Sequence, residues 1–371
     1  PGPLSFWPMK ILRLDIDGLR CIRQARIAAG EGVHLLVGPN GAGKTTVLEA
    51  IHLLGYGRSF RSGQRDAVIQ RGAEQSLVFA ELASTVARHR VGLRRAASDW
   101  SGRVDETDVA GLVDLFRICP VVCFEPGSHA LISGPAELRR AYLDWSVFHV
   151  EPDFLPAWRR HQRALKQRNA GLRSGWSEPL LIPWEQELAE TGLRIAEIRG
   201  RVLDELRGPV GTLASAFLPE LGQVELNLTT GYGDRDSSSA ASILSAYAAS
   251  RDLDRERGHT RFGVHRADWS LGFAAAPRRE HLSRGQEKLA ALIMELGQVE
   301  HFRQRTGDWP VMLLDDLASE LDRDHQERVL DWIFAAGLQA WITGTEVPER
   351  LRARREPWRL FHVEQGRVTP A

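Results

Sequence analysis

A glycine-rich stretch near the N-terminus has the residue types, in the order, that phosphate binding requires. Glycines let backbone N–H groups turn towards phosphate oxygens without a clash from a Cβ atom. Lys44 would reach the β- and γ-phosphates, and the Thr45 hydroxyl would bind Mg²⁺. The stretch therefore predicts a nucleotide site, and the alternative is a glycine-rich turn that binds nothing. Its members are Gly38, Pro39, Asn40, Gly41, Ala42, Gly43, Lys44, Thr45 and Thr46.

Two adjacent acids, Asp315 and Asp316, close a second apolar run over 311–314. A buried parallel strand delivers the residues at its carboxyl end to the ligand crevice of an α/β sheet. There Asp315 would hold Mg²⁺, directly or through water. Asp316 would polarise the attacking water, and the metal would offset the repulsion between the two carboxylates. The alternative is a strand that simply ends in a polar turn.

A third candidate is the tetrapeptide Ser283-Arg284-Gly285-Gln286, which precedes a helical run over 289–296. Ser283 could act only as the N-cap of that helix. Capping does not explain Gly285 and Gln286. Together with Ser283 they would offer an anion backbone N–H groups, a hydroxyl and a helix dipole.

The segment from Trp158 to Arg173 contains six basic residues and no acid. Positions 159, 163 and 166 share one helical face. Because the formal net charge of the chain is zero, a run of this kind is a candidate phosphate-contacting surface. The alternative is a solvated helix face. The candidate contacts are Arg159, Arg160, Arg163, Lys166 and Arg168.

Hydrophobic patterning predicts the elements that must position these residues. Short apolar runs predict buried strands over 33–37, 121–124 and 311–314, with a helix over 47–54 directly after the glycine-rich stretch. Alternation predicts half-buried strands over 11–16 and 76–95, with a turn near 99–102. The region 136–206 is helical in pattern, divided by turn signals at 171–175 and 178–183. No heptad pattern is long enough for an extended coiled coil.

The composition is that of a globular protein, with 371 residues, 43% hydrophobic and 26% charged. The three cysteines, Cys21, Cys119 and Cys123, are odd in number and widely spaced, which argues against a disulfide framework or a zinc site. No apolar segment approaches membrane-spanning length and no signal peptide is present, so we expect a cytoplasmic protein. Residues 1–8 precede Met9 and resemble a tag remnant.

The phosphate loop, the Leu-Ser-x-Gly-Gln signature and the acidic strand, in this order, resemble those of ABC-type ATPases. More closely, the chain resembles the RecF family of bacterial recombination and gap-repair proteins over nearly all of its length from Met9. The segments that carry the specific resemblance are Arg58–Arg61, Arg139–Asp144, His265–Asp268 and Leu314–Asp322.

The resemblance implies a mixed α/β (α+β) fold, with an ABC-type ATPase head, an inserted helical arm and no long coiled coil. Residues 9–125 would form the first part of the ATPase core. Residues 126–280 would form the arm, and 281–371 would supply the signature helix and the rest of the core.

The resemblance also implies a function. Two chains would close on two ATP molecules with Mg²⁺ and bind single-stranded DNA, double-stranded DNA and gap junctions. They would help RecO and RecR to place RecA. Lys44 and Asp316 would be catalytic, and Ser283, Gly285, Gln286 and Thr343 would contact the nucleotide. The base position holds Asp316 instead of glutamate, and the switch position holds Thr343 where histidine is usual, so we expect slow hydrolysis.

Two other classes share parts of this pattern. The ATPase subunit of a membrane transporter would have the same motifs, and DNA-dependent ATPase activity would distinguish the two. A P-loop kinase for a small molecule would have no use for the segment 283–286 and would transfer phosphate to a metabolite.

Overall fold

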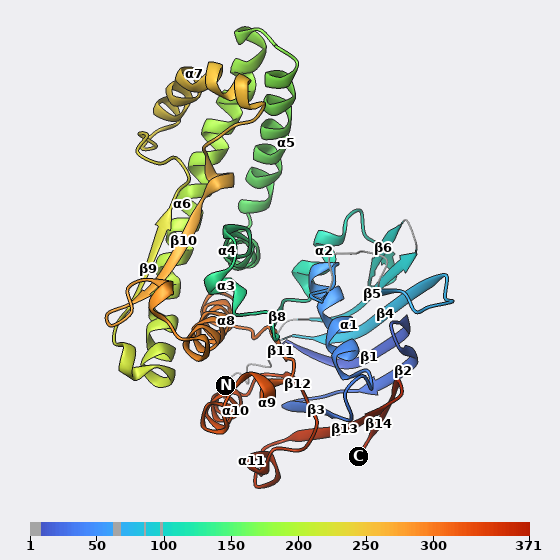
Figure 1. Cartoon of the computed structure of the whole chain (residues 1–371). Coiled ribbons are helices and arrows are strands. Elements are labelled where there is room, and N and C mark those ends of the chain that lie inside the picture. Colours follow the sequence, from blue (N-terminus) through green and yellow to red (C-terminus); the bar gives the residue numbers. More distant parts are fainter. Residues whose placement is uncertain (1–8, 62–67, 85–86, 97–98) are drawn as a thin grey trace, which may run out of the picture. The chain divides into compact units, whose positions relative to one another are not determined.

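The computed structural model describes residues 9–61, 68–84, 87–96 and 99–371, so the expected tag remnant over 1–8 lies outside the described residues. The chain divides into two compact units. We call residues 1–128 with 292–371 the head, and residues 129–291 the arm. Helices and sheets are mixed throughout, which confirms the predicted α/β class (Figure 1).

A six-stranded, mainly parallel sheet forms one layer of the head, in the order β14-β13-β3-β12-β11-β8. Only the pairing of β14 with β13 is antiparallel. The buried strands predicted over 33–37, 121–124 and 311–314 are confirmed at these bounds, because continuous apolar runs suit parallel strands covered on both faces. The strands are β3 (Val33–Val37), β8 (Val121–Phe124), β11 (Val311–Leu314), β12 (Ala340–Gly344), β13 (Trp358–Glu364) and β14 (Arg367–Pro370).

The second sheet of the head is antiparallel, in the order β2-β1-β4-β5-β6-β7. The turn predicted near 99–102 is wrong in position, because Trp100 already pairs with Arg95 in the ladder. Gly102 lies inside a strand at a point where the Val109 side chain approaches the backbone closely, since a Cβ at Gly102 would lie 2.8 Å from Val109. The strands are β1 (Lys10–Leu19), β2 (Ile22–Ala28), β4 (Gln75–Ala83), β5 (Arg88–Ala96), β6 (Trp100–Val104) and β7 (Thr107–Asp108).

Helix α1 (Lys44–Tyr56) contacts strands of both sheets, and all of its residues except Thr45 and Tyr56 are buried. Its apolar side chains join the two sheets into one core, which fixes the end of the helix that follows β3. No helix among the described residues is long and apolar enough to span a membrane. The other helices of the head are α2 (Leu112–Ile118), α9 (Leu317–Glu320), α10 (Arg323–Ala336), α11 (Glu349–Arg352) and the later part of α8 (Arg284–Thr306).

The arm is mostly helical, and its two longest helices, α5 and α6, pack along each other. Strands β9 (Val224–Thr229) and β10 (Asp268–Phe273) form an antiparallel ribbon, and β9 packs on α6 (Figure 1). The helices are α3 (Ala130–Ser133), α4 (Ala136–Val150), α5 (Phe154–Arg173), α6 (Glu178–Phe217), α7 (Ala240–Arg257), the 3₁₀ turns η2 (Pro219–Leu221), η3 (Val264–Arg266) and η4 (Arg279–His281), and the start of α8.

The connection between α5 and α6 tests both turn signals of this region. The turn predicted at 171–175 is confirmed, since α5 ends at Arg173 and Gly175 adopts a φ of 67°. The turn predicted over 178–183 is wrong, because α6 begins at Glu178 and continues through Pro183. Pro183 is the sixth residue of α6, so its missing N–H removes a single backbone hydrogen bond, and burial of Leu181 in the same turn stabilises the helix across it.

Candidate functional site

The phosphate loop lies between β3 and α1, and two of its glycines are required by their surroundings. A Cβ at Gly38 would lie 2.0 Å from the carbonyl oxygen of Val363 in β13. Gly43 has a φ of 114°, which only glycine adopts without strain. The N–H of Gly366 donates to the carbonyl of Ala42 at 2.8 Å, so the turn between β13 and β14 also supports the loop.

Lys44 is the first residue of α1, and its side chain turns back over the loop. The ammonium group donates to the carbonyl oxygens of Gly38 at 2.7 Å and Pro39 at 3.0 Å. The side chain is buried, with 9% of the residue exposed. A buried ammonium held by the loop carries its charge at the point where the loop would receive phosphate oxygens.

Asp315 follows β11 and connects the two halves of the predicted site. Its Oδ1 accepts hydrogen bonds from the hydroxyls of Thr45 at 2.9 Å and Thr343 at 2.8 Å. The Thr343 hydroxyl also accepts from the backbone N–H of Asp316 at 2.8 Å. The structure thus brings Lys44, Thr45, Asp315, Asp316 and Thr343 to the carboxyl edge of the parallel sheet, at the ends of β3, β11 and β12.

The electrostatics of Asp315 suit a metal ion. Burial raises the pKa of the carboxyl group, and the hydrogen bonds from Thr343 and Thr45 only partly counteract this shift. Asp315 forms no ion pair with any described residue. No group of three or more His, Cys, Asp or Glu residues that could hold a metal occurs in the described part of the chain. Mg²⁺ is commonly held by one or two carboxylates together with substrate phosphates, so a single buried acid beside a hydroxyl fits it.

Asp316 adopts a left-handed backbone conformation, with φ 51° and ψ 44°. Such a conformation is uncommon for residues other than glycine and often marks positions that a site constrains. The backbone bond to Thr343 holds Asp316 at the N-cap position of α9, directly beside Asp315.

Sequence reasoning missed the support behind the phosphate loop. Glu49 of α1 is fully buried, and it accepts hydrogen bonds from Arg20 at 2.7 Å and 2.9 Å. The hydroxyl of Ser59 also donates to Glu49. The Arg58–Arg61 segment therefore fixes α1 from behind. The available signal was an acid in the middle of an otherwise apolar helix.

The segment from Ser283 to Gln286 belongs to the arm and forms a reciprocal cap at the start of α8. The N–H of Gln286 donates to the Ser283 hydroxyl at 3.3 Å, and the N–H of Ser283 donates to the Gln286 side chain at 3.0 Å. This capping accounts for Ser283 and Gln286. It does not account for Gly285. A Cβ at this position would meet no atom within 4 Å, so packing within the chain does not require a glycine there either.

Helix α5 corrects part of the predicted phosphate-contacting surface. Arg168 is fully buried and donates to Asp254 at 2.8 Å and Glu185 at 3.2 Å. Its prediction as a phosphate contact is wrong, because both carboxylates already neutralise its guanidinium away from solvent. Arg160 is exposed but forms an ion pair with Glu187.

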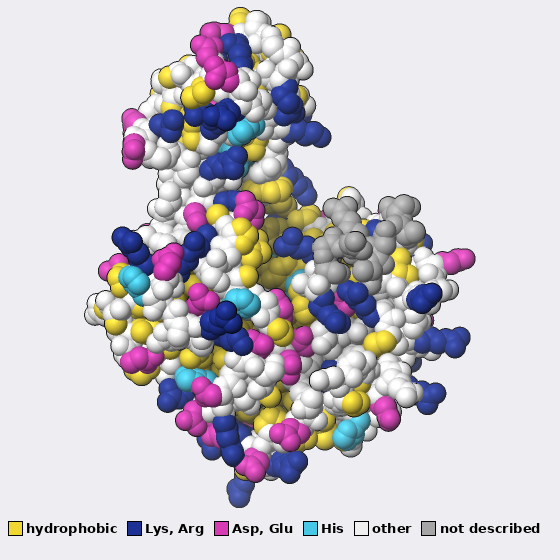
Figure 2. Space-filling view, in the orientation of Figure 1, with side chains coloured by type: hydrophobic (Ala, Val, Ile, Leu, Met, Phe, Trp, Pro, Cys, Tyr) yellow, Lys and Arg dark blue, Asp and Glu magenta, His cyan; other side chains and the backbone are white. Residues whose placement is uncertain are grey.

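The other three predicted phosphate contacts of this helix remain available to a partner. Arg159, Arg163 and Lys166 are exposed, and none forms an ion pair with a described residue. Lys and Arg side chains are elsewhere interspersed with Asp and Glu over the face in view (Figure 2). Unpaired cations on one helical face, and not the net charge, would therefore provide any phosphate contacts.

The segments 139–144 and 265–268 contact each other inside the arm. Asp268 accepts two hydrogen bonds from Arg139, at 2.7 Å and 2.9 Å. Arg140 donates to the carbonyl of Ala267 at 2.7 Å. These contacts brace the arm and leave Asp268 paired within its own unit.

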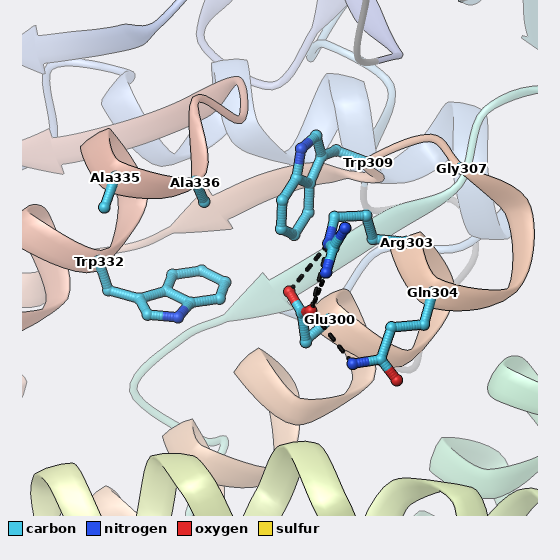
Figure 3. Close-up of a pocket in the computed structure, with 8 residues that line it drawn as sticks. All are labelled: Glu300, Arg303, Gln304, Gly307, Trp309, Trp332, Ala335 and Ala336. Carbon is cyan, nitrogen blue, oxygen red and sulfur yellow. Dashed lines mark hydrogen bonds and ion pairs between the residues drawn. The ribbon is translucent and has the colours of Figure 1, made fainter. Parts of the chain in front are cut away.

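The head also has a hollow of about 780 Å³ between the end of α8 and α10. Trp309 and Trp332 meet there edge to face, with ring centres 6.2 Å apart, and Arg303 lies over Trp309 and pairs with Glu300 (Figure 3). Trp309 precedes β11, whereas Asp315 follows it. The hollow therefore lies at the opposite edge of the parallel sheet from the phosphate loop.

Comparison with known proteins identifies the family. Residues 10–369 match the model described as RecF/RecN/SMC N terminal domain. The DNA replication and repair protein RecF of Xanthomonas axonopodis pv. citri (strain 306) is 46% identical over 365 residues, covering 97% of this chain and 98% of that protein. The RecF protein of Shewanella oneidensis is 36% identical, covering 97% of this chain and 99% of that protein.

Solved structures agree in fold. The recombination mediator protein RecF with ATP, of the RecFOR pathway, matches with a TM-score of 0.89 at 24% identity over 99% of both chains. The Smc head domain with an extended coiled coil from Pyrococcus furiosus matches with a TM-score of 0.58 at 14% identity, covering 98% of this chain and 96% of that one. With the phosphate loop and the acidic strand at one sheet edge, these matches lead to one conclusion: the chain belongs to the RecF family.

Proposed function

We propose that this chain is an ATP-dependent DNA-binding protein of replication-gap repair, and that it hydrolyses ATP slowly as a switch. The observation that carries the proposal is the convergence of Thr45 and Thr343 on Asp315 beside the phosphate loop. The relatives are named as DNA replication and repair proteins. These names do not favour the alternative, the ATPase subunit of a membrane transporter.

The residues of the head divide the work of phosphoryl transfer. The loop from Gly38 to Thr46 would bind the phosphates, and Lys44 would place a positive charge near the β- and γ-phosphates. Thr45 and Asp315 would hold Mg²⁺, which when bound neutralises charge that develops on the phosphate oxygens. Asp316 would orient the attacking water and accept its proton.

The expectation of slow hydrolysis has a geometric basis. The Thr343 hydroxyl donates to Asp315 and accepts from the N–H of Asp316, so its hydrogen-bonding capacity is largely used within the site. A hydroxyl also cannot exchange protons near neutral pH as an imidazole does. Asp316 therefore works without help from the switch position.

Replacement of Asp316 by asparagine tests this assignment. We expect Asp316→Asn to bind ATP with near wild-type affinity but to hydrolyse it about 10²–10⁴-fold more slowly, because an amide cannot accept the proton. Binding of a fluorescent ATP analogue and release of phosphate measure the two properties separately. Hydrolysis at the wild-type rate would show that Asp316 is not the base.

Ser283, Gly285 and Gln286 would act on the nucleotide of a second chain. Two identical chains that meet in this way would form a two-fold interface with two ATP sites. The Ser283 hydroxyl would donate to the γ-phosphate, and the open space at Gly285 would admit it closely. Because ADP lacks that phosphate, hydrolysis would loosen the dimer.

Sedimentation velocity with ATP and Mg²⁺ tests this assembly. We expect Ser283→Arg to bind ATP through its own Lys44 and Thr45 but to remain monomeric, since a bulky cation replaces a small hydroxyl. The matched control is Ser177→Arg, which also alters an exposed serine directly before a helix, α6, but lies outside the signature. The mechanism fails if the Ser283→Arg variant dimerises normally with ATP, or if the wild-type dimer is equally stable with ADP.

The remaining parts of the proposal concern partners. Arg159, Arg163 and Lys166 would contact DNA phosphates on single strands, duplexes and gap junctions. RecO and RecR would be the protein partners, and the assembly would help to place RecA on gaps. The solved RecF relatives act in the RecFOR pathway, which supports this assignment.

A further inference from the structure

Two histidines and two tyrosines of the arm are among the described residues with buried polar atoms that lack a hydrogen-bond partner. These atoms are His161 Nε2, His265 Nδ1 and the hydroxyl oxygens of Tyr232 and Tyr247. They come from α5, η3, the loop after β9, and α7. Buried polar atoms are nearly always hydrogen-bonded to protein or to ordered water. His265 also belongs to the segment 265–268, which the nucleotide site does not use.

The hydrogen bonds of the two histidines fix which ring nitrogen carries the proton. The Thr191 hydroxyl donates to the carbonyl of Glu187 at 2.5 Å, so it must accept from His161 Nδ1 at 3.1 Å. His265 Nε2 lies 3.2 Å from the carbonyl of Thr260, which can only accept. Burial lowers the pKa of His161 to about 3 and that of His265 to about 4, so both rings are neutral. The two orphaned nitrogens are therefore bare lone pairs that need a donor.

Two glycines bring the orphaned atoms close together. A Cβ at Gly192 would lie 2.3 Å from the Tyr232 hydroxyl oxygen and 3.7 Å from His161 Cε1. A Cβ at Gly263 would lie 2.9 Å from the Tyr247 hydroxyl oxygen and 3.2 Å from His265 Nδ1. Larger residues at either position would occupy the space around these atoms.

The spacing of the histidines suits one small bridging ligand. Their ring centres are 6.3 Å apart, and the planes are inclined by 37°. One water oxygen that donates to two imidazole nitrogens at normal hydrogen-bond lengths would separate the ring centres by roughly 6 to 6.5 Å. The two tyrosine hydroxyls shift each other's pKa through a side-chain hydrogen bond that falls short of good geometry, so they lie near each other and one hydroxyl proton remains available to a further acceptor.

The surrounding charges decide the chemical class of the ligand. Positive charge on Arg199 lowers the pKa of His161, and Arg266, Arg140 and Arg168 act in the same direction on His265. Two imidazole nitrogens are fewer ligands than a protein metal site usually has, and no group of three or more His, Cys, Asp or Glu residues that could hold a metal occurs among the described residues. Bare nitrogen lone pairs oppose an anion. A small neutral molecule that donates two hydrogen bonds and accepts others remains.

We propose that the arm contains a binding site for one internal water molecule, which donates to His161 Nε2 and His265 Nδ1 and accepts from a tyrosine hydroxyl. The water ties α5, α7 and η3 together at the point where their own side chains cannot meet. It gives His265 a role in bracing the arm, next to the pairing of Asp268 with Arg139. The glycines at 192 and 263 are then required by the space that the water and the tyrosines fill.

Crystallography of the full chain, with diffraction data that resolve ordered water, tests the site directly. We expect one peak within hydrogen-bond distance of both orphaned nitrogens, with no anomalous signal at a transition-metal edge. In the variant Tyr142→Phe, which alters a buried tyrosine of α4 outside the cluster, the peak should persist. An empty space, or a peak with metal anomalous signal, would overturn the proposal.

A stability measurement gives a second, independent result whose sign is decisive. We expect the double variant Tyr232→Phe/Tyr247→Phe to melt about 2–4 °C lower than the wild type, because the water loses the tyrosine hydroxyl that donates to it. If the hydroxyls truly lacked partners, removing them would relieve a penalty and raise the melting temperature. An unchanged or raised melting temperature therefore contradicts a bound water.

Discussion

Asp315 in the head and two buried carboxylates in the arm differ in what compensates their charge. In the head, Asp315 accepts hydrogen bonds from two threonine hydroxyls and has no ion pair with a described residue. In the arm, Glu185 and Asp254 are fully buried, and both contact Arg168. Arg251 adds a second guanidinium to Glu185.

The difference separates a structural acid from a functional one. A charge in a low-dielectric interior is costly unless a counter-charge lies beside it. The arm provides its counter-charges from its own helices, so its acids need nothing from outside. In the head, the charge of Arg61 acts on Asp315 only at a distance and without an ion pair, so a cation from outside the chain can still bind and neutralise the carboxylate. A buried acid without an ion pair therefore indicates a site more reliably than an acid in an ion-pair network.

The largest expected effect is on the arm. Replacement of Arg168 by methionine keeps the volume roughly constant but leaves Glu185 and Asp254 short of a counter-charge. We expect the free energy of unfolding to fall by about 3–5 kcal/mol, measured by urea denaturation. The matched control, Arg160→Met, removes an exposed pair with Glu187 and should cost about 0–1 kcal/mol. Equal losses for the two variants would contradict the comparison.

An intermediate effect is expected at the head, on the binding of ATP. Replacement of Asp315 by asparagine removes the charge that would hold Mg²⁺. We expect affinity for ATP in the presence of Mg²⁺ to fall roughly 10–100-fold, a range typical when the groups around a bound metal are altered. Titration with a fluorescent ATP analogue, with and without Mg²⁺, measures this change. A loss of the same size in Asp316→Asn would undermine the separate roles of the two acids.

The pH dependence of stability sharpens the same contrast. The pKa of Asp315 is raised in the folded state, so between the unfolded and folded values the native protein holds a proton that the unfolded chain has released. Stability contributed by this group is therefore lost as pH rises through that window. Without Mg²⁺, Asp315→Asn should unfold at higher urea than the wild type at pH 7.5, and this gain should shrink as pH falls towards 4. A gain that is independent of pH would show that the Asp315 charge carries no penalty.

The smallest expected effect is on DNA binding by the exposed basic residues of α5 that form no ion pair. Replacing Arg159, Arg163 and Lys166 with alanine should weaken DNA binding on every sequence alike. The slope of log affinity against log salt should become shallower by roughly one unit for each lost phosphate contact. Fluorescence anisotropy at several salt concentrations measures the slope, with Arg160→Ala as the paired-cation control. An unchanged slope would show that this helix face is an ordinary solvated surface that makes no phosphate contacts.

The sequence pattern predicts an element correctly where neighbouring residues alone determine its structure. The strands over 33–37, 121–124 and 311–314 are continuous apolar runs, and the structure places them at those bounds. The convergence of Thr45 and Asp315, which are 270 residues apart, also followed from strand ends meeting at one sheet edge. The predicted catalytic and ligand-binding roles remain predictions.

The predictions that are wrong concern residues whose structure is determined by tertiary contacts and not by their neighbours in the chain. The local pattern groups Arg168 with exposed bases, because its partners, Glu185 and Asp254, lie 17 and 86 residues away in the chain. The pattern predicts a break at Pro183, although packing of the buried Leu181 continues α6 through it. It predicts a turn at Gly102, although this glycine allows a close approach to Val109 inside a strand.

The contact between Gly38 and the Val363 carbonyl has a consequence for synthesis on the ribosome. The glycine-rich loop emerges long before the strand that it rests against, because β13 lies far behind it in the chain. The bond from Gly366 to Ala42 adds a second dependence, on the turn between β13 and β14. A nascent or truncated chain that ends before β13 would contain every residue of the phosphate loop without the strand behind it. Nucleotide binding should therefore arise only after β13 and this turn have been translated.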